Sequence, residues 1–359
     1  MKNRILIVTP KLSTSGGVSS FWNALLPVLK TYDDLIITTL EVGGHSKNIF
    51  GPFMDQWNLK KSITRQTKLV FLNPSLGSRS FFRDALFAKQ LIKKDIPFVV
   101  FFHGWSLDFE KKIDSQYIGF FLNTFGRAKK IFVLSQDFKG KILEWGYKGE
   151  VIIETTNVDS TLLDDFILEK KLSNVKTVTK IKILFLARLL REKGVFETVE
   201  AFRKLSEKYD NIELTIAGDG KDLDELKELV KDDKNIVVAG YVEGQDKIDL
   251  FRDSHIYCFP TFYGEGLPTS ILEAMAFGMP VITTNMGGLK EFFQNENMGY
   301  FVEPKNVEDL ESKLDILLID KEKIITIAQD NYNYAHEKLL NTAAAKRIYK
   351  HIKEVIGEK

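Results

Sequence analysis

The chain has 359 residues, of which 44% are hydrophobic and 28% charged, and its formal net charge is +1. This length corresponds to about two domains, and so small a net charge argues against a protein that binds nucleic acid over its whole surface. The charge is divided unevenly, because residues 1–150 hold 22 basic and 12 acidic side chains and the remainder holds 28 and 37. The first part therefore suits an anionic partner, such as a membrane surface or a phosphorylated acceptor, although chance surface composition explains the excess equally well.

The single cysteine, Cys258, lies in the apolar run 256–259 and is expected to be a buried core residue. The sequence contains no disulfide framework and no Cys/His cluster with metal-ligand spacing. The first residues lack the length and cleavage site of a signal peptide, and no apolar run reaches the roughly 18–20 residues of a membrane span. We expect a cytoplasmic protein without cofactor or metal, at most peripheral to the cytoplasmic face of a membrane.

Short apolar runs alternate with helical patterns in the first half of the chain, as in a parallel sheet covered by helices. Residues 5–8 form a predicted buried strand, and Gly16 and Gly17 behind it would let the backbone approach a ligand before a helix over about 19–30. A glycine pair alone is weak evidence, since any tight turn would use it. Further strands are expected at 35–40, 69–72, 98–102, 131–135 and 151–157, a helix at 81–94, and an irregular basic stretch at 53–68.

His103 follows the predicted strand at 98–102. The carboxyl ends of strands are where open α/β sheets bind ligands. A lone histidine in such a place is more often a structural residue, so its role stays open at this point.

A polar stretch near 160–178 is interpreted as the interdomain linker, and a second α/β unit begins at Ile181. Arg188 and Lys193 share the loop after its first strand, where an arginine fork and a compact ammonium group would suit a diphosphate. Any such loop can carry basic residues, so this pair alone does not decide the matter. Gly218 follows the next strand, and Tyr241 and Val242 follow the one after it.

Residues 261–280 read as a strand end, a glycine-rich loop and a helix that stops at Gly278. The unpaired N–H groups at the start of that helix would point at Glu265, Gly266 and Leu267, which makes the loop a site for an anion such as a phosphate. One turn into the helix, Thr269 and Glu273 share a face. A capped helix with one solvated glutamate would explain two spaced carboxylates as well.

The whole pattern from 264 to 281, Gly-Glu-Gly-Leu-Pro-(x)3-Leu-Glu-Ala-Met-Ala-(x)-Gly-Met-Pro-Val, is more specific. It resembles the donor-site signature of the retaining glycosyltransferases of family 4, also called glycosyl transferases group 1. The resemblance implies the GT-B fold, an α/β architecture with two Rossmann-like doubly wound domains that face each other across a cleft. We expect an acceptor-binding domain at 1–165, a nucleotide-sugar-binding domain at 178–335, and a C-terminal helix within 336–359 that can pack back toward the first domain.

The resemblance also implies roles for individual residues. Arg188 and Lys193 would neutralise the leaving diphosphate, Glu273 would accept hydrogen bonds from the ribose, and His103 would touch the sugar from the first domain. The implied catalytic residues are Glu265, His103, Arg188 and Lys193. The implied donor-binding residues are Gly16, Gly17, Arg188, Lys193, Gly218, Tyr241, Val242, Glu265, Gly266, Leu267, Thr269 and Glu273.

The expected reaction moves a sugar from a nucleotide sugar, by default a UDP-sugar, to a glycan or lipid-linked acceptor in bacterial surface polysaccharide synthesis. It would not need a metal, because Asp222 and Asp224, the one Asp-x-Asp pair, read as the solvated face of an acidic helix. Two alternatives stay open: a nucleotide-sugar epimerase on the same fold and a non-catalytic sugar-binding subunit. A dinucleotide-dependent oxidoreductase is disfavoured, since no Gly-x-Gly-x-x-Gly follows a strand.

Two basic stretches in the first half could meet an anionic leaflet, with apolar insertion added by any exposed phenylalanine between them. They comprise Lys60, Lys61, Arg65 and Lys68 in one stretch, and Arg79, Phe81, Phe82, Arg83, Lys93 and Lys94 in the other. A soluble acceptor and a basic surface without function is the alternative.

Overall fold

The computed structural model describes residues 2–14, 16–44, 51–263 and 267–357. The chain divides into two compact units, Met1–Asp159 together with Asn341–Lys359 (unit 1), and Ser160–Leu340 (unit 2). Our sequence boundaries at 165, 178 and 336 differ from these. The chain therefore passes from unit 1 to unit 2 and back again.

Unit 1 is built on a six-stranded sheet in which every neighbouring pair is parallel. Its order is β2-β1-β3-β5-β7-β8, with β1 (Asn3–Thr9), β2 (Leu35–Glu41), β3 (Thr67–Leu72), β5 (Phe98–Phe101), β7 (Lys130–Val133) and β8 (Glu150–Ile153). A two-stranded parallel ladder joins β4 (Ser75–Leu76) to β6 (Gly104–Trp105). The strands are apolar almost throughout because both faces are covered: Ile5 and Ile7 enter one core cluster, and Leu6 and Val8 the other.

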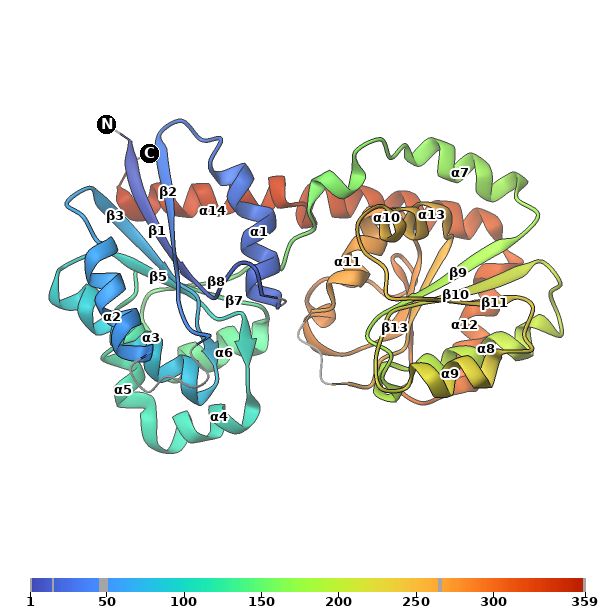
Figure 1. The fold of residues 1–359 in the computed structure, drawn as a ribbon, viewed down its shortest axis with the longest axis horizontal. Coiled ribbons are helices and arrows are strands. Elements are labelled where there is room, and N and C mark those ends of the chain that lie inside the picture. The colour runs from blue at the N-terminus through green and yellow to red at the C-terminus, as the bar shows by residue number, and fades with distance from the viewer. Residues whose placement is uncertain (1, 15, 45–50, 264–266, 358–359) are drawn as a thin grey trace. The chain divides into compact units, whose positions relative to one another are not determined.

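Helices cover both faces of this sheet (Figure 1). They are α1 (Gly17–Leu29), α2 (Gly51–Ser62), α3 (Ser78–Lys93), α4 (Leu107–Lys112), α5 (Ile118–Leu122), α6 (Gln136–Glu144) and α14 (Asn341–Ile356). Helix α14, from the far end of the sequence, packs beside α1 and buries Ala344, Ala345, Ile348 and Ile352 in the core cluster of Ile5 and Ile7. The last turns of the chain thus complete the core of the first unit.

Helix α2 corrects the expectation of an irregular stretch at 53–68. Its buried positions include Asp55 and Leu59, one turn apart, whereas Phe53 and Trp57 are exposed. A carboxylate on the inner face and aromatic rings on the outer face reverse the usual amphipathic pattern, so the helical period was hidden.

Unit 2 repeats the architecture with a second six-stranded parallel sheet. Its order is β11-β10-β9-β12-β13-β14, with β9 (Ile181–Leu186), β10 (Ile212–Ala217), β11 (Ile236–Gly240), β12 (Ile256–Phe259), β13 (Val281–Thr284) and β14 (Gly299–Val302). The helices are α7 (Leu168–Thr177), α8 (Val195–Ser206), α9 (Leu223–Val230), α10 (Gly244–Asp253), α11 (Thr269–Ala276), α12 (Val307–Ile319) and α13 (Lys321–Tyr334). When the six strands of unit 2 are numbered by their order along the chain, the sheet order is 3-2-1-4-5-6, the doubly wound order of dinucleotide-binding folds.

Helix α7 occupies much of the stretch that we interpreted as a linker. It packs on α13 and buries Leu168, Lys171 and Val175, at spacings of three and four residues. The central buried position is a lysine, whose Nζ donates to the carbonyl oxygen of Phe251 at the end of α10 (2.8 Å). A charged residue in the middle of the apolar stripe explains why the pattern was missed.

Candidate functional site

The order of strands in unit 2 places a crevice between β9 and β12. From β9 the chain runs outward through β10 and β11, and then returns to the other side of β9 with β12. Open α/β sheets bind ligands at such a switch point, outside the carboxyl ends of the strands. The loop after β9 carries Arg188 and Lys193, so the structure puts both predicted cations at this point.

Lys193 ends a short 3-10 turn (Arg191–Lys193), and only 5% of its surface is exposed. Its Nζ lies 4.3 Å from the centre of the Tyr263 ring and 5.8 Å from that of Phe259, both reached from β12. The pKa of Lys193 is lowered to about 8, mainly by burial and to a smaller extent by the positive charge of Arg188, which is exposed. Two cations held close together in a partly buried place favour an anion between them.

The loops around these cations touch backbone to backbone. The N–H of Leu189 donates to the carbonyl of Asp219 (2.9 Å), and that of Phe262 donates to the carbonyl of Glu192 (2.9 Å). Gly218 has a φ of +140°, and a Cβ added there would lie 1.8 Å from the carbonyl oxygen of Ala187. Only glycine lets the loops after β9 and β10 pack this closely.

Helix α11 presents Glu273 beside the same sheet edge. The carboxylate is largely buried, and Lys247 on α10 pairs with it at 2.7 Å. Burial raises the pKa of Glu273, and Lys247 acts in the opposite direction. Sequence reasoning missed Lys247, which is 26 residues away and belongs to no pattern shared with Glu273.

The other predicted residues of unit 2 lie at the start of α11, after β11, or outside the described residues. Leu267 is half-buried just before α11, and Thr269, its first residue, is exposed. Tyr241 is 70% exposed and donates to Glu243 (3.1 Å), and Val242 is half-buried. Glu265 and Gly266, assigned to the transferred sugar, lie outside the described residues.

Of the Asp-x-Asp pair, Asp224 is exposed and Asp222 is half-buried. Oδ2 of Asp222 accepts a hydrogen bond from the backbone N–H of Arg191 (2.6 Å). The side chain thereby ties the start of α9 to the loop that carries Lys193. Within the described part of the chain, no group of three or more His, Cys, Asp or Glu side chains is arranged to hold a metal ion.

In unit 1 the corresponding switch point lies between β1 and β3, and Asn73 and His103 stand there. Asn73, directly after β3, donates from Nδ2 to the carbonyl of Val8 (2.9 Å), which turns its Oδ1 toward His103 Nε2 (3.0 Å). Burial lowers the pKa of His103 to about 3, and its ring stacks on Phe101 at 3.8 Å. The imidazole is therefore neutral, with the proton on Nε2 and the lone pair on Nδ1.

Gly16 and Gly17 precede and begin α1. A Cβ added to either would meet nothing within 4 Å, so neither glycine is required by the packing of the protein itself. Asn73 was not predicted, although a polar residue immediately after a buried strand could have been noticed.

Comparison with known proteins identifies a family for part of the chain. Residues 167–335 match the family model described as glycosyl transferases group 1. Unit 2 carries a glycosyl transferases group 1 domain.

The chain is also similar to a relative in Staphylococcus aureus, the capsular polysaccharide biosynthesis glycosyltransferase CapM. The two are 25% identical over 209 residues, which cover 57% of this chain and 53% of that one. The chain spans about half the length of the curated relatives it matches. Among solved structures, a glycosyltransferase from Rickettsia africae aligns over the whole of both chains with a TM-score of 0.73 and 22% identity. The Anabaena protein Alr3699/HepE in complex with UDP aligns over 99% of this chain and 100% of that one (TM-score 0.71, 15% identity). These likenesses confirm the predicted GT-B fold.

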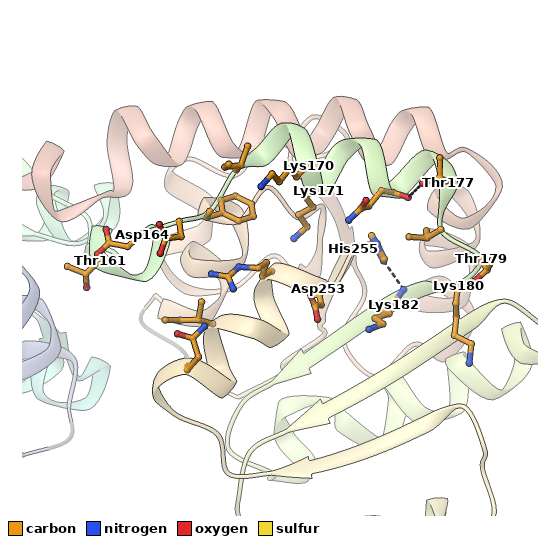
Figure 2. A pocket seen from close by; sticks show the side chains of 18 residues that line it. Thr161, Asp164, Lys170, Lys171, Thr177, Thr179, Lys180, Lys182, Asp253 and His255 are labelled. Carbon is orange, nitrogen blue, oxygen red and sulfur yellow. Dashed lines mark hydrogen bonds between the residues drawn. The ribbon is translucent and has the colours of Figure 1, made fainter.

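A cavity of about 1110 Å³ also lies in the glycosyl transferases group 1 domain, between α7, α10 and the start of β9 (Figure 2). Lys182 and His255, which line it, stand at the amino ends of the strands and not at the edge that carries Lys193. They are joined to each other, because the N–H of Lys182 donates to His255 Nδ1 (3.0 Å). Burial lowers the pKa of His255 to about 4 and that of Lys171 to about 7. Lys171 and His255 each have a hydrogen-bond partner within the protein, so their burial serves the packing of α7 and α10 on the sheet and does not indicate a ligand site.

None of the described helices is both long enough and apolar enough to cross a bilayer.

Proposed function

We propose that the protein is a retaining glycosyltransferase of family 4 that transfers a hexosyl group from a nucleotide sugar, with UDP the favoured nucleotide. The observation that carries this proposal is the buried Lys193 beside Arg188 at the switch point of a glycosyl transferases group 1 domain. Support for UDP comes from HepE, a protein of the same fold that was solved with that nucleotide.

The chemistry needs positive charge where the leaving group gathers negative charge. As the bond between the anomeric carbon and the phosphate oxygen breaks, Arg188 and Lys193 stabilise the departing diphosphate. The start of α11 adds the positive end of a helix dipole. No metal ion is required in this scheme, since fixed cations take its place.

Retention of configuration follows if the acceptor attacks from the face that the diphosphate leaves. The acceptor oxygen forms the new bond to the anomeric carbon, and its proton passes to the departing phosphate oxygen. Glu265 then positions the sugar with the amides of Gly266 and Leu267, and acts as no nucleophile. His103 Nδ1, a neutral acceptor, suits a sugar hydroxyl, and Glu273, held by Lys247, suits the ribose hydroxyls.

The acceptor is proposed to be a glycan or a lipid-linked sugar of bacterial surface polysaccharide synthesis, by similarity to the capsular relative in Staphylococcus aureus. The protein would act in the cytoplasm, in peripheral contact with an anionic membrane surface.

The test is incubation of the pure protein with a panel of nucleotide sugars, in the presence of a chelator, with release of nucleoside diphosphate as the readout. We expect slow hydrolysis of one UDP-sugar and release of the sugar with its anomeric configuration kept, which proton NMR detects. Formation of a new nucleotide sugar without any acceptor would identify an epimerase instead. Binding of UDP without turnover of any donor or acceptor would identify a sugar-binding subunit.

A further inference from the structure

Two neighbouring helices of unit 1 expose an unusual amount of apolar surface. On α2, Phe53 is 80% exposed, Trp57 57% and Met54 48%, and on α3 Leu86 is 45% and Phe82 36% exposed. Figure 1 shows α2 and α3 side by side on one face of the sheet, and hydrogen bonds from Gln56 and Gln90 join them. Exposed apolar patches of this kind mark sites of contact with a partner or a membrane.

The exposed residues of α3 form one continuous stripe. Arg79, Phe82, Leu86, Lys89 and Lys93 are spaced three or four residues apart, and each is exposed. On α2 the exposed aromatic residues are followed by Lys60 and Lys61, and the Nζ of Lys61 lies 3.3 Å from the centre of the Trp57 ring. Both helices therefore combine apolar residues with basic residues on their outer faces.

The acidic residues of the two helices are kept away from this surface. Asp55 and Asp84 are their only acidic residues, and each is 2% exposed. The outer faces consequently carry positive charge alone, which complements an anionic surface.

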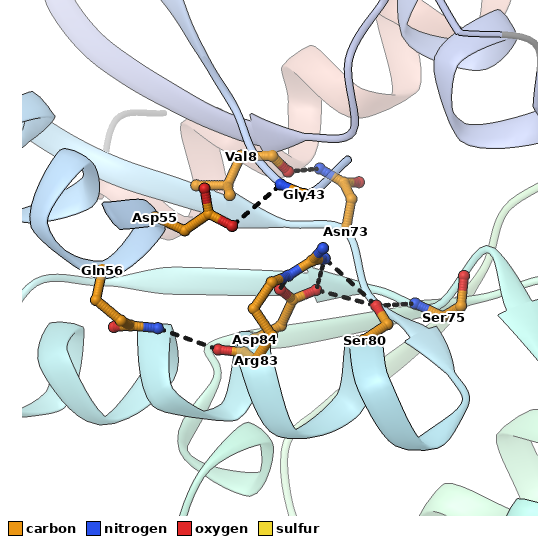
Figure 3. A network of polar contacts seen from close by, with 9 residues as sticks. All are labelled: Val8, Gly43, Asp55, Gln56, Asn73, Ser75, Ser80, Arg83 and Asp84. Carbon is orange, nitrogen blue, oxygen red and sulfur yellow. Dashed lines mark hydrogen bonds and ion pairs between the residues drawn. The ribbon is translucent and has the colours of Figure 1, made fainter. Parts of the chain in front are cut away.

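A polar network beneath the helices holds this arrangement (Figure 3). Asp55 Oδ2 accepts from the N–H of Gly43 (3.0 Å), Gln56 donates to the carbonyl of Arg83 (3.2 Å), and Arg83 Nε pairs with Asp84 (2.6 Å). Arg83 thus belongs to the interior network, and Phe81 is fully buried. Neither residue therefore belongs to the outer surface of α3: Phe81, which was expected to insert only if exposed, is buried, and the Arg83 guanidinium is held by Asp84.

Between the two helices lies a hollow of about 430 Å³, lined by Phe53, Gln56, Leu86, Lys89, Gln90 and Lys93. Its mouth combines a phenylalanine and a leucine with two lysines. This combination suits an acyl chain whose anionic headgroup stays at the rim.

We propose that the outer faces of α2 and α3 bind the surface of a bilayer that contains anionic lipids. The α2–α3 face is defined by Phe53, Met54, Trp57, Phe82 and Leu86 with Lys60, Lys61, Arg79, Lys89 and Lys93. Trp57 and Phe53 enter the interface, and the lysines reach the headgroups. This inference deepens the membrane contact in the proposed function and does not depend on its chemistry.

The first experiment is co-sedimentation of the full chain with vesicles of phosphatidylglycerol and phosphatidylcholine, and with vesicles of phosphatidylcholine alone. We expect binding to the anionic vesicles that weakens with added salt. Changing Lys60, Lys61 and Lys93 to Ser should reduce the affinity at least about tenfold. The matched control changes Lys227, Lys231 and Lys234, three exposed lysines of unit 2, to Ser and should leave the affinity unchanged. No binding at low salt, or equal losses in both variants, would overturn the proposal.

The second experiment measures insertion. Lipids brominated on the acyl chain should quench the tryptophan fluorescence of the bound protein, and Trp57→Phe should remove most of that quenching while binding persists. Trp22 and Trp145 are buried at 0% and 2%, and Trp105 is stacked against Phe138, so they serve as internal references. Binding without quenching of Trp57 would mean that the face does not insert.

Apolar variants complete the test. The double change Phe53→Ser and Leu86→Ser should weaken vesicle binding, whereas Leu229→Ser and Ile319→Ser, at exposed apolar positions of unit 2, should not. All variants should keep their affinity for UDP, which separates failure of the α2–α3 face from failure of the proposed transferase function. Vesicle binding that survives the double change would count against the face and favour a protein partner for it.

Discussion

The charge of Lys193 depends on pH within the range that is easily tested in solution. Burial and Arg188 lower its pKa to about 8, so it is mainly charged at pH 7 and mainly neutral at pH 9. In the proposed site the charged form of Lys193 would bind the diphosphate, and a bound diphosphate would in turn stabilise the protonated form. We expect the affinity for UDP to fall as the pH rises from 7 to 9.

Calorimetric titrations across this range would measure the change, and uptake of protons on binding near pH 8 should accompany it. In the variant Lys193→Arg the affinity for UDP should fall less between pH 7 and 9, because arginine keeps its charge. A UDP affinity that is equal at pH 7 and 9 would exclude Lys193 from the phosphate site.

Arg188 and Lys193 should distinguish phosphate from nucleoside. Arg188→Ala and Lys193→Ala should each weaken UDP binding by about 1.5–3 kcal/mol, the value of a charged hydrogen bond, and leave uridine binding nearly unchanged. Arg191→Ala is the control from the same loop, since the Arg191 side chain already pairs with Glu225 (2.5 Å). Equal losses for UDP and uridine would contradict the assignment.

At this scale the sequence predicts residues that belong to motifs and misses their partners. Arg188, Lys193 and Glu273 were predicted as site residues because the motifs that contain them resemble those of a known family. Lys247 and Asn73 orient predicted side chains from 26 and 30 residues away. Such contacts arise only when strands and helices are brought together in the sheet, so no local period reveals them.

Among the elements, the loops after β9 and β10 depend on a glycine. Gly218→Ala should lower the free energy of unfolding by about 3 kcal/mol or more, because it adds a clash with the Ala187 carbonyl to backbone strain. Gly140 in α6 is the control: a Cβ there meets nothing within 4 Å, so Gly140→Ala should stabilise by about 0.5–1 kcal/mol. Urea unfolding of both variants measures the difference, and comparable effects would refute the argument.

Helix α7 is tied to α10 through Lys171, and this tie has a pH dependence. The pKa of Lys171 is lowered to about 7 in the folded protein, below its usual value of about 10.4 in an unfolded chain. Between these values the unfolded state binds the extra proton, so this group makes stability rise with pH from 7 to about 10. Asp253, His255 and Lys182 share the surroundings and add smaller effects.

The variant Lys171→Met should therefore have a higher free energy of unfolding than the original protein at pH 6. This difference in stability should shrink as the pH approaches 10. Urea unfolding at several pH values would show this trend. A difference that does not vary with pH would mean that Lys171 keeps an ordinary pKa.

The strands were predictable and the two helices α2 and α7 were not, because prediction from sequence relies on the pattern of apolar residues. Buried parallel strands are continuous apolar runs, which stand out in any sequence. Helices α2 and α7 place Asp55 and Lys171 at buried positions, where hydrogen bonds satisfy them. The hydrophobic period is broken wherever tertiary partners make such a residue acceptable.

At the scale of the whole molecule, the fold followed from repeated strand-and-helix patterns and one motif. The resemblance also implied that the C-terminal helix can pack back toward the first domain, whereas the boundaries between the two units differ from those expected. The helix at the C-terminus joins unit 1 through apolar packing and through Arg347, which pairs with Glu154 (2.5 Å), a carboxylate that is 2% exposed. Neither partner belongs to a recognisable pattern.

Removal of residues 341–359 should consequently destabilise unit 1 and spare unit 2. The truncation uncovers the cluster of Ala344, Ala345, Ile348 and Ile352 and leaves Glu154 buried without Arg347. Limited proteolysis followed by mass spectrometry should find the early cuts within 1–159 and a resistant fragment from 160–340. Early cuts spread over both units would show that the two do not unfold separately.

The return of the chain to unit 1 also orders events during synthesis. The chain on both sides of unit 2 belongs to unit 1 (Figure 1), and unit 2 is an insertion between Asp159 and Asn341. A ribosome that adds about 5–20 residues per second would make residues 160–340 in roughly ten to forty seconds. Through that interval unit 2 is still being made, and the apolar surface that α14 covers in the folded protein stays exposed on the nascent chain. We expect cellular chaperones to engage the first-made half of this protein and to leave the later-made half alone.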